Sequence, residues 1–405
     1  MIPLSNRNIY QAFALAVVIT FCLLCLIVPL LNPVDNWDML GYAASIKSLY
    51  GLDVAAIHAS VFTEYKSYAT AQHFELLTAD SSYRRTMHTD AEAFYQQIPF
   101  YKIRVLYILL LTAASQAGVN VFTAMHFFSP FFGAAAFLTL YLGMRHHVHP
   151  FVWIVAPPFY FFLTLEFSLF QHGGVDSFAF FWVAMTAVAF FRGSKWLYPL
   201  LALSVLVRTD LILHAALMFA IALYFNRTDW RQIIVWGVIT LIAYFSVNSW
   251  AGNFGWTALI NFVFVSDMLA THPEQYAQNK LEVKQYLGFV LGKHDWISPW
   301  FWLSIAISML NLLILLAIFL LPRIQQYFDE DQIRSARRLQ IISAVCLVYI
   351  ISHYILFPAV FMRFFYGQCF LSILALLTTM SLAAWREEIR QLRDSTKRSV
   401  NSGNA

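Results

Sequence analysis

Residues 12–31 read AFALAVVITFCLLCLIVPLL, and residues 32–42 continue as NPVDNWDMLGY. The first stretch holds no charged side chain over its 20 residues, which is about the length of helix that crosses the hydrocarbon core of a bilayer. We expect this helix to end near Asn32, because Pro33 disfavours a helical conformation in the residue before it. The polar residues that follow should therefore lie at one surface of the membrane.

The rest of the chain repeats this apolar pattern. Hydrophobic residues make up 60% of the sequence and charged residues 12%, whereas a soluble domain carries about 25% charged residues. These proportions predict an all-α, polytopic integral membrane protein. Further apolar blocks approach the length of a membrane span: Val121–Met144, Phe151–Leu165, Phe178–Phe191, Ile233–Trp250, Trp300–Leu321, Leu339–Phe357 and Phe364–Ala384.

The basic residues predict the orientation, because short loops rich in Lys and Arg stay in the cytoplasm. About ten spans with both termini inside give one membrane domain over residues 1–385, outer loops at 32–104 and 251–299, and a basic cytoplasmic tail at 386–405. The net charge of +4 is therefore associated with membrane segments, and no nucleic-acid partner is predicted. The clusters placed inside are Arg7, Arg145, Arg192 with Lys195, Arg227 with Arg231, Arg323 with Arg334, Arg337 and Arg338, and residues 386–398.

This topology depends on two interpretations. Val105–Ala117 is only 13 residues long, so we expect it to lie in the membrane interface rather than to cross. Trp196–Phe225 is interpreted as two short spans that meet at the outer face. A single helix would bury Arg208 and Asp210 near the middle of the membrane, at a cost of about 2.5–3.5 kcal/mol each.

Asp38 is the first candidate functional residue. Tyr42 follows it by four positions, so both side chains lie on one face of the helix that we expect to begin near Trp37. A carboxylate at the membrane surface can act as a general base toward a hydroxyl or an amine. The alternative is structural, because an acidic residue also stabilises the N-terminus of a helix.

Other polar residues are predicted on the same outer face. Glu166 and Asp176 bracket a short loop that contains His172, although a short polar loop between helices also occurs without any function. Arg208 with Asp210, and later Arg363, interrupt apolar stretches. Guanidinium groups match phosphate oxygens, but such arginines also pair with nearby acids or extend toward water.

Acids that can activate a nucleophile and arginines that can hold a phosphate favour group transfer from a lipid-linked phosphate donor. The predicted ionisable groups crowd toward one face of the membrane, whereas a transporter typically places them near its middle and shows internal repeats. Two alternatives stay open. One is a transporter or lipid flippase for precursors of envelope glycans, and the other is a non-catalytic assembly subunit.

Short motifs in this set resemble the GT-C superfamily of membrane glycosyltransferases, in particular the protein O-mannosyltransferases and the aminoarabinose transferases that modify lipid A. Asp38-Met39-Leu40-Gly41-Tyr42 is similar to the acidic D-E-x-x-Y motif that opens the family's first outer loop, with Met39 in place of the second acid. Pro99 and Lys102 stand near the place of a Lys-Pro-Pro element. Further similar elements are Gly118-Val119-Asn120, Ser129-Pro130, Gly173-Gly174-Val175-Asp176, Arg208-Thr209-Asp210 and Arg363-Phe364-Phe365-Tyr366.

The resemblance implies a GT-C-like fold whose long first outer loop carries interfacial helices. It also implies a glycosyltransferase of the cell envelope, placed in the bacterial inner membrane among membrane lipids, that uses a polyprenyl-phosphate sugar donor. Asp38 would be the catalytic base. Asp176, Glu166 and His172 would orient the acceptor or bind a divalent cation, Arg208 and Arg363 would bind the donor phosphate, and Tyr42, Asp210 and Lys102 would support the site.

Overall fold

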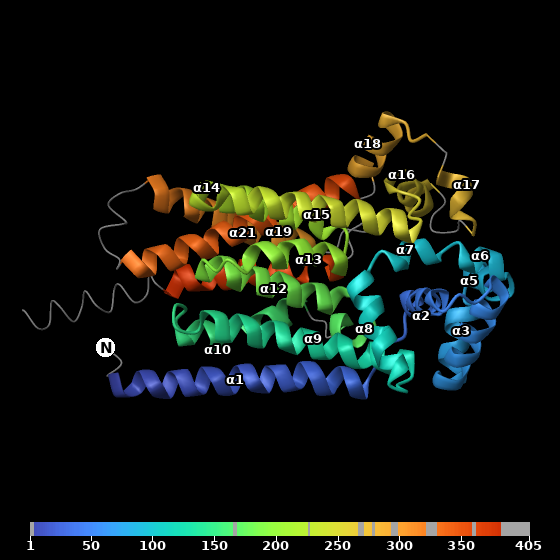
Figure 1. Ribbon diagram of the computed structural model, residues 1–405. Coiled ribbons are helices and arrows are strands. Elements are labelled where there is room, and N and C mark those ends of the chain that lie inside the picture. The colour runs from blue at the N-terminus through green and yellow to red at the C-terminus, as the bar shows by residue number, and fades with distance from the viewer. Residues whose placement is uncertain are drawn as a thin grey trace, which may run out of the picture.

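The computed structural model describes residues 4–164, 168–225, 227–265, 271–277, 280–292, 299–320, 330–358 and 362–381. Within these residues the chain is helical and contains no β-strand, apart from one isolated bridge between Val34 and His172. Figure 1 shows the long helices side by side in one bundle, with short helices gathered at one end. The predicted all-α class is therefore confirmed.

The bundle supports the predicted membrane class. Four of the described helices are long and apolar enough to cross a membrane, namely Ile9–Leu31, Val121–Met144, Trp230–Ala251 and Arg334–Leu356. The predicted total of ten spans remains a prediction. The bundle helices are α1 (Leu4–Leu31), α9 (Val121–Met144), α10 (Pro150–Thr164), α12 (Asp176–Arg192), α13 (Leu197–Val207), α14 (Leu211–Phe225), α15 (Trp230–Ala251), α19 (Pro299–Leu320), α21 (Glu330–Leu356) and the helix at Tyr366–Ser381.

The residues between α1 and α9 fold into short helices at one end of the bundle, as expected for a long first loop with helices. Asp53, Thr70, Ser81 and Asp90 begin four of these helices, since each side chain accepts a hydrogen bond from a backbone N–H of the first turn. The helices are α2 (Trp37–Leu49), α3 (Val54–Tyr68), α4 (Ala71–Ala79), α5 (Ser82–Thr89), α6 (Ala91–Tyr95), α7 (Ile98–Lys102) and α8 (Val105–Gln116).

The helix α8 has 12 residues, too few to cross a bilayer by itself. It meets the preceding segment Ala91–Lys102 at a bend of 112°. The two segments together are apolar and long enough for one span, but the bend gives them the shape of a broken or re-entrant element. The expected position of α8 in the membrane interface remains a prediction.

The expected break near Arg208 is present. The helix α13 ends at Val207, Arg208 has an extended backbone, and α14 begins at Leu211. These two short helices pack against each other and against α15. The break holds Arg208 and Asp210 at the end of the bundle that carries the short helices.

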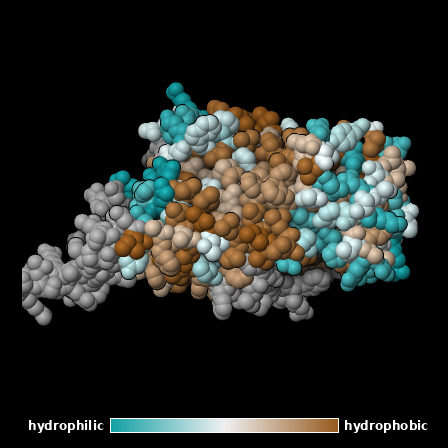
Figure 2. Space-filling model, turned by 90° about the horizontal axis from the view of Figure 1, so that it is seen from below, coloured by the Kyte–Doolittle hydropathy of each residue, from teal (hydrophilic) through white to brown (hydrophobic). Residues whose placement is uncertain are grey.

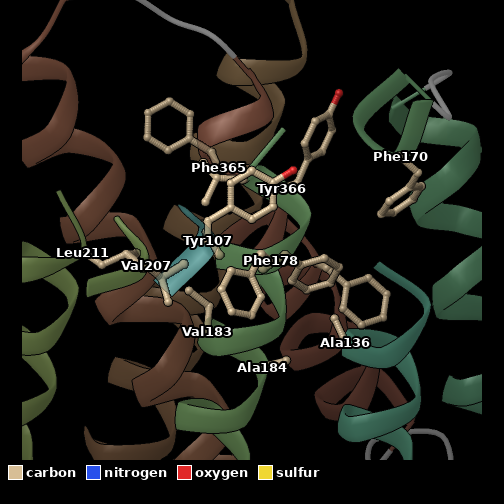
Figure 3. Close-up of a cluster of buried hydrophobic side chains, with 14 of the residues drawn as sticks. Tyr107, Ala136, Phe170, Phe178, Val183, Ala184, Val207, Leu211, Phe365 and Tyr366 are labelled. Carbon is tan, nitrogen blue, oxygen red and sulfur yellow. The ribbon is translucent and has the colours of Figure 1, made fainter. Parts of the chain in front are cut away.

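Next to the short helices, the bundle contains a core of aromatic and aliphatic side chains. Figure 2 shows hydrophobic residues over the middle of the bundle and hydrophilic residues over the short helices. In Figure 3, side chains from α8, α9, α12 and the 365–366 segment come together, among them Tyr107, Ala136, Phe178 and Phe365. All of them are buried. Two further segments, α11 (Ser168–Gln171) and η3 (Met362–Phe364), connect bundle helices near the candidate site.

Candidate functional site

Asp38 lies in the first turn of α2 with its side chain 23% exposed. Its carboxylate forms an ion pair with Nη1 of Arg363 at 2.9 Å and accepts a hydrogen bond from the Tyr101 hydroxyl at 3.3 Å. Burial disfavours the charged form of Asp38, but the guanidinium groups of Arg363 and Arg104 outweigh it and hold the pKa of Asp38 below its usual value. Asp38 is therefore an ionised carboxylate at neutral pH.

Arg363 connects α2 to the bundle. Its Nε lies 3.7 Å from Oδ2 of Asp176, the first residue of α12, while its Nη1 contacts Asp38. The ring of Phe364 lies 5.4 Å from the guanidinium carbon of Arg363 and 4.5 Å from that of Arg208. Both cations therefore pack on one aromatic ring, where cation–π attraction adds to their ion pairs.

Arg208 is bound by two carboxylates and its side chain is 6% exposed. Its Nη1 donates to Asp176 at 2.9 Å, and its Nε and Nη2 donate to the two oxygens of Asp210 at 3.0 Å and 2.7 Å. On α21, Tyr349 donates its hydroxyl hydrogen to Asp210 at 3.0 Å, and Nε2 of His353 lies 3.4 Å from the same carboxylate. These contacts hold Arg208 and Asp210 as a structural pair.

Arg104 is in a different environment. Its Nη1 donates to the backbone oxygen of Phe100 at 2.7 Å, and its guanidinium carbon lies 5.5 Å from the ring centre of Tyr42 and 5.7 Å from that of Tyr101. Among the described residues, no carboxylate lies within ion-pair distance of Arg104. Burial, followed by the nearby Asp38 carboxylate, raises the pKa of Tyr101, so its phenol stays protonated beside these charges.

These charged groups lie at a cavity of about 720 Å³ between the short helices and the bundle. One part of its wall is charged and contains Asp38, Arg84, Arg104, Arg208, Asp210 and Arg363. The rest is mainly apolar or aromatic, so the cavity has the chemistry of a site for an amphipathic molecule. Residues in this second part are Phe100, Ile212, Leu213, Tyr244, Trp256, Leu259, Phe262, Leu356 and Phe357.

Five of the residues singled out in the sequence therefore lie together, namely Asp38, Asp176, Arg208, Asp210 and Arg363. The other predicted site residues, which are Tyr42, Lys102, His172 and Glu166, are not in this group. Tyr42 is buried and packs against Tyr101 at 5.5 Å between ring centres. The Lys102 ammonium lies 4.6 Å from the ring centre of Trp250 and is not among the described residues that line the cavity. The backbone of His172 pairs with Val34, and Glu166 lies outside the described residues.

The sequence did not single out Arg104, Tyr101, Tyr349 or His353. Arg104 is two residues from Lys102, and the bend between α7 and α8 determines which of the two basic side chains reaches the cavity. Tyr349 and His353 are four residues apart on α21, so they lie on one face of that helix. That spacing was the only signal in the sequence for these two residues.

A second polar network is centred on Asp35, in the segment between α1 and α2. Oδ1 of Asp35 lies 2.8 Å from Nε2 of His126, and its Oδ2 lies 2.9 Å from the Tyr65 hydroxyl and 3.1 Å from Nδ1 of His73. Nδ1 of His126 lies 3.2 Å from the backbone oxygen of Gln171. The network therefore connects the segment between α1 and α2 with α3, α4, α9 and the end of α11.

We expect Asp35→Asn to lower the unfolding temperature of the purified protein at pH 7, because the amide keeps only one of the two acceptor oxygens and a hydrogen bond to a charged group contributes about 1.5–3 kcal/mol. Burial disfavours the Asp35 carboxylate, but its partners, first His126 and Tyr65, hold its pKa below the usual value. A depressed pKa contributes stability above the unfolded value of about 3.9 that is lost as the pH falls. The difference between wild type and Asp35→Asn should therefore shrink below about pH 4.

The control for this measurement is Asp80→Asn. Asp80 pairs with Arg84 at 3.1 Å on the surface of the same loop, with 55% of its side chain exposed. Such pairs contribute about 0–1 kcal/mol, so we expect little change in unfolding temperature. An equal fall in unfolding temperature in both variants would contradict a larger stabilising contribution from Asp35 than from Asp80.

Among the described residues, no group of three or more His, Cys, Asp or Glu side chains is placed to hold a metal ion. Comparisons with protein-family models, with curated proteins and with solved structures found no match to this chain.

Proposed function

We propose that this protein is a membrane glycosyltransferase with a GT-C-like fold. It takes a sugar from a polyprenyl-phosphate donor and transfers it to an acceptor on the outer face of the membrane. The observation that carries the proposal is the position of the Asp38 carboxylate, which pairs with Arg363 and lies with Arg104 in the wall of a cavity that is otherwise largely apolar.

The cavity fits a lipid-linked phosphate better than a fully polar substrate. A polyprenyl-phosphate sugar has a charged and hydroxylated head and a long hydrocarbon chain. Its binding site therefore needs a charged surface for the head and an apolar surface for the chain. Its head would lie near Asp38 and Arg104, and the first isoprene units would contact apolar residues such as Leu213 and Phe357. A volume of about 720 Å³ is within the usual range for small-molecule sites.

Arg104 and Arg363 would bind the donor phosphate in this arrangement. Arg104 supplies a guanidinium that has no described carboxylate within ion-pair distance, and Arg363 lies next to the proposed base. Arg208, also assigned to the phosphate from the sequence, makes three hydrogen bonds to Asp176 and Asp210. Its proposed contribution is therefore positive potential and the positioning of Asp176.

Asp38 would act as the base. The acceptor oxygen attacks the anomeric carbon of the sugar and its proton passes to Asp38. The bond between that carbon and the phosphate oxygen breaks, and its electron pair leaves on the phosphate. Cationic groups stabilise the charge that develops on the leaving oxygen. Arg363 lies between Asp38 and Asp176, where it supplies positive charge to the site.

The position of Met39 is compatible with a single catalytic acid. Met39 is fully buried and packs close to the backbone of Gly173. A Cβ atom placed on that glycine would lie 3.1 Å from the Met39 side chain. Met39 therefore points into the protein interior and is not among the described residues that line the cavity. A second acid at this position would be buried rather than facing a substrate in the present conformation.

The first test replaces the base. The gene is deleted, and the strain is complemented with wild type, Asp38→Asn or Glu75→Gln, followed by analysis of surface glycans. Asp38→Asn keeps the size of the side chain, and removing a general base costs about 10²–10⁴-fold in rate, so we expect the glycan to be lost. Glu75 is an exposed acid on α4, and its amide variant should restore the glycan. Full complementation by Asp38→Asn would show that Asp38 is not the base.

The second test concerns the phosphate. Purified Arg104→Gln should bind undecaprenyl phosphate in detergent about ten to a hundred times more weakly than wild type, because a hydrogen bond to a charged group contributes about 1.5–3 kcal/mol. Arg231→Gln is the control, since Arg231 is an exposed arginine in the first turn of α15. Equal affinity in Arg104→Gln and wild type would remove Arg104 from the phosphate site.

A further inference from the structure

The helix α18 (Val283–Gly292) belongs to the second long loop and carries more apolar surface than the protein covers. At 100° per residue, Val283, Leu287 and Leu291 follow one another at intervals of 40° along one side. Tyr286, Phe289 and Val290 continue the apolar surface on the adjoining side, and Gln285 lies on the remaining side. The apolar surface therefore covers more than half of the circumference of the helix.

The protein covers one half of this apolar surface. The ring of Phe289 stacks on Phe264 with 5.5 Å between ring centres, and Tyr286 packs edge-on against Trp256 at 5.2 Å. The hydroxyl of Tyr354 on α21 donates to the backbone oxygen of Val290 at 2.9 Å. These contacts fix which side of α18 faces the bundle.

The other half faces outward. Val283 is 75% exposed, Leu287 48% and Leu291 68%. Three large apolar side chains in a row on one exposed face are unusual at a surface that contacts only water. Lys284 borders this row and is also exposed, so its hydrocarbon stem can lie along apolar surroundings while its ammonium stays in water.

The position of α18 along the bundle places this row at the level where lipid meets water. Figure 1 shows α18 beside α16 (Trp256–Ile260), near the end of α15 where the short helices gather. Trp250 near the end of α15 and Trp256 at the start of α16 are both exposed, and exposed tryptophans are typical of the boundary between lipid and water. Because Tyr286 touches Trp256, α18 lies at the same level.

We propose that α18 is an in-plane membrane helix that embeds Val283, Leu287 and Leu291 in the lipid layer at this end of the bundle. Lys284 borders the apolar row, where its ammonium can reach the headgroup region while the row lies in lipid. Trp256 both touches α18 and lines the cavity. The attachment of α18 to lipid therefore stabilises one wall of the cavity, whatever molecule occupies it.

The test measures where α18 lies. The full-length protein, with its four cysteines replaced by alanine, receives one spin label at Leu287→Cys or, as the matched control, at Gln285→Cys on the opposite side of the helix. Both proteins are reconstituted in vesicles of phosphatidylethanolamine and phosphatidylglycerol. Relaxation by oxygen, which enters lipid, is compared with relaxation by a water-soluble nickel chelate. We expect the ratio of oxygen to nickel accessibility to be severalfold higher at 287 than at 285.

A ratio at 287 equal to or below that at 285 would overturn the proposal, because it would place the apolar row in water. Spin–spin broadening at 287 that disappears on dilution with unlabelled protein would also overturn it, since a second copy of the chain would then cover the row. Leu291→Cys gives an independent reading and should behave like 287. Both positions are already exposed, so neither substitution removes a buried contact.

Discussion

The guanidinium group of Arg363 lies between two carboxylates from distant parts of the chain, Asp38 in the first loop and Asp176 at the start of α12. Asp176 in turn pairs with Arg208, and Arg208 with Asp210. Positive and negative groups therefore alternate along a line that joins α2, η3, α12 and the break before α14. The short helices and the bundle meet along this line, and the cavity lies beside it.

Such a line is costly to build, because charges lose hydration when they are buried, and it is stable only if each charge has a partner. Most of its members have two partners, and Tyr101, Tyr349 and His353 bond to its carboxylates from neighbouring helices. The result is a rigid set of dipoles and charges, fixed before any substrate arrives. Preorganisation of this kind is the main electrostatic means by which an active site stabilises charge in a transition state.

Much of this arrangement could be predicted from residue patterns. The apolar blocks predicted a helical membrane protein, and the cost of burying Arg208 and Asp210 predicted the break between α13 and α14. The same reasoning grouped Asp38, Asp176, Arg208 and Arg363 on one face. The position of Arg104 could not be predicted, because it depends on the 112° bend before α8. Nor could the network of Asp35, whose partners His73 and His126 are 38 and 91 residues away.

The central proposal is that this protein binds a polyprenyl-phosphate sugar in the cavity and uses it as the donor. The most direct measurement is mass spectrometry of the lipid extract from a strain that lacks this gene, compared with the strain complemented by wild type. The account predicts that a polyprenyl-phosphate sugar accumulates in the deletion strain and returns to its normal level on complementation. An unchanged set of polyprenyl-phosphate sugars, together with loss of the surface glycan, would contradict it.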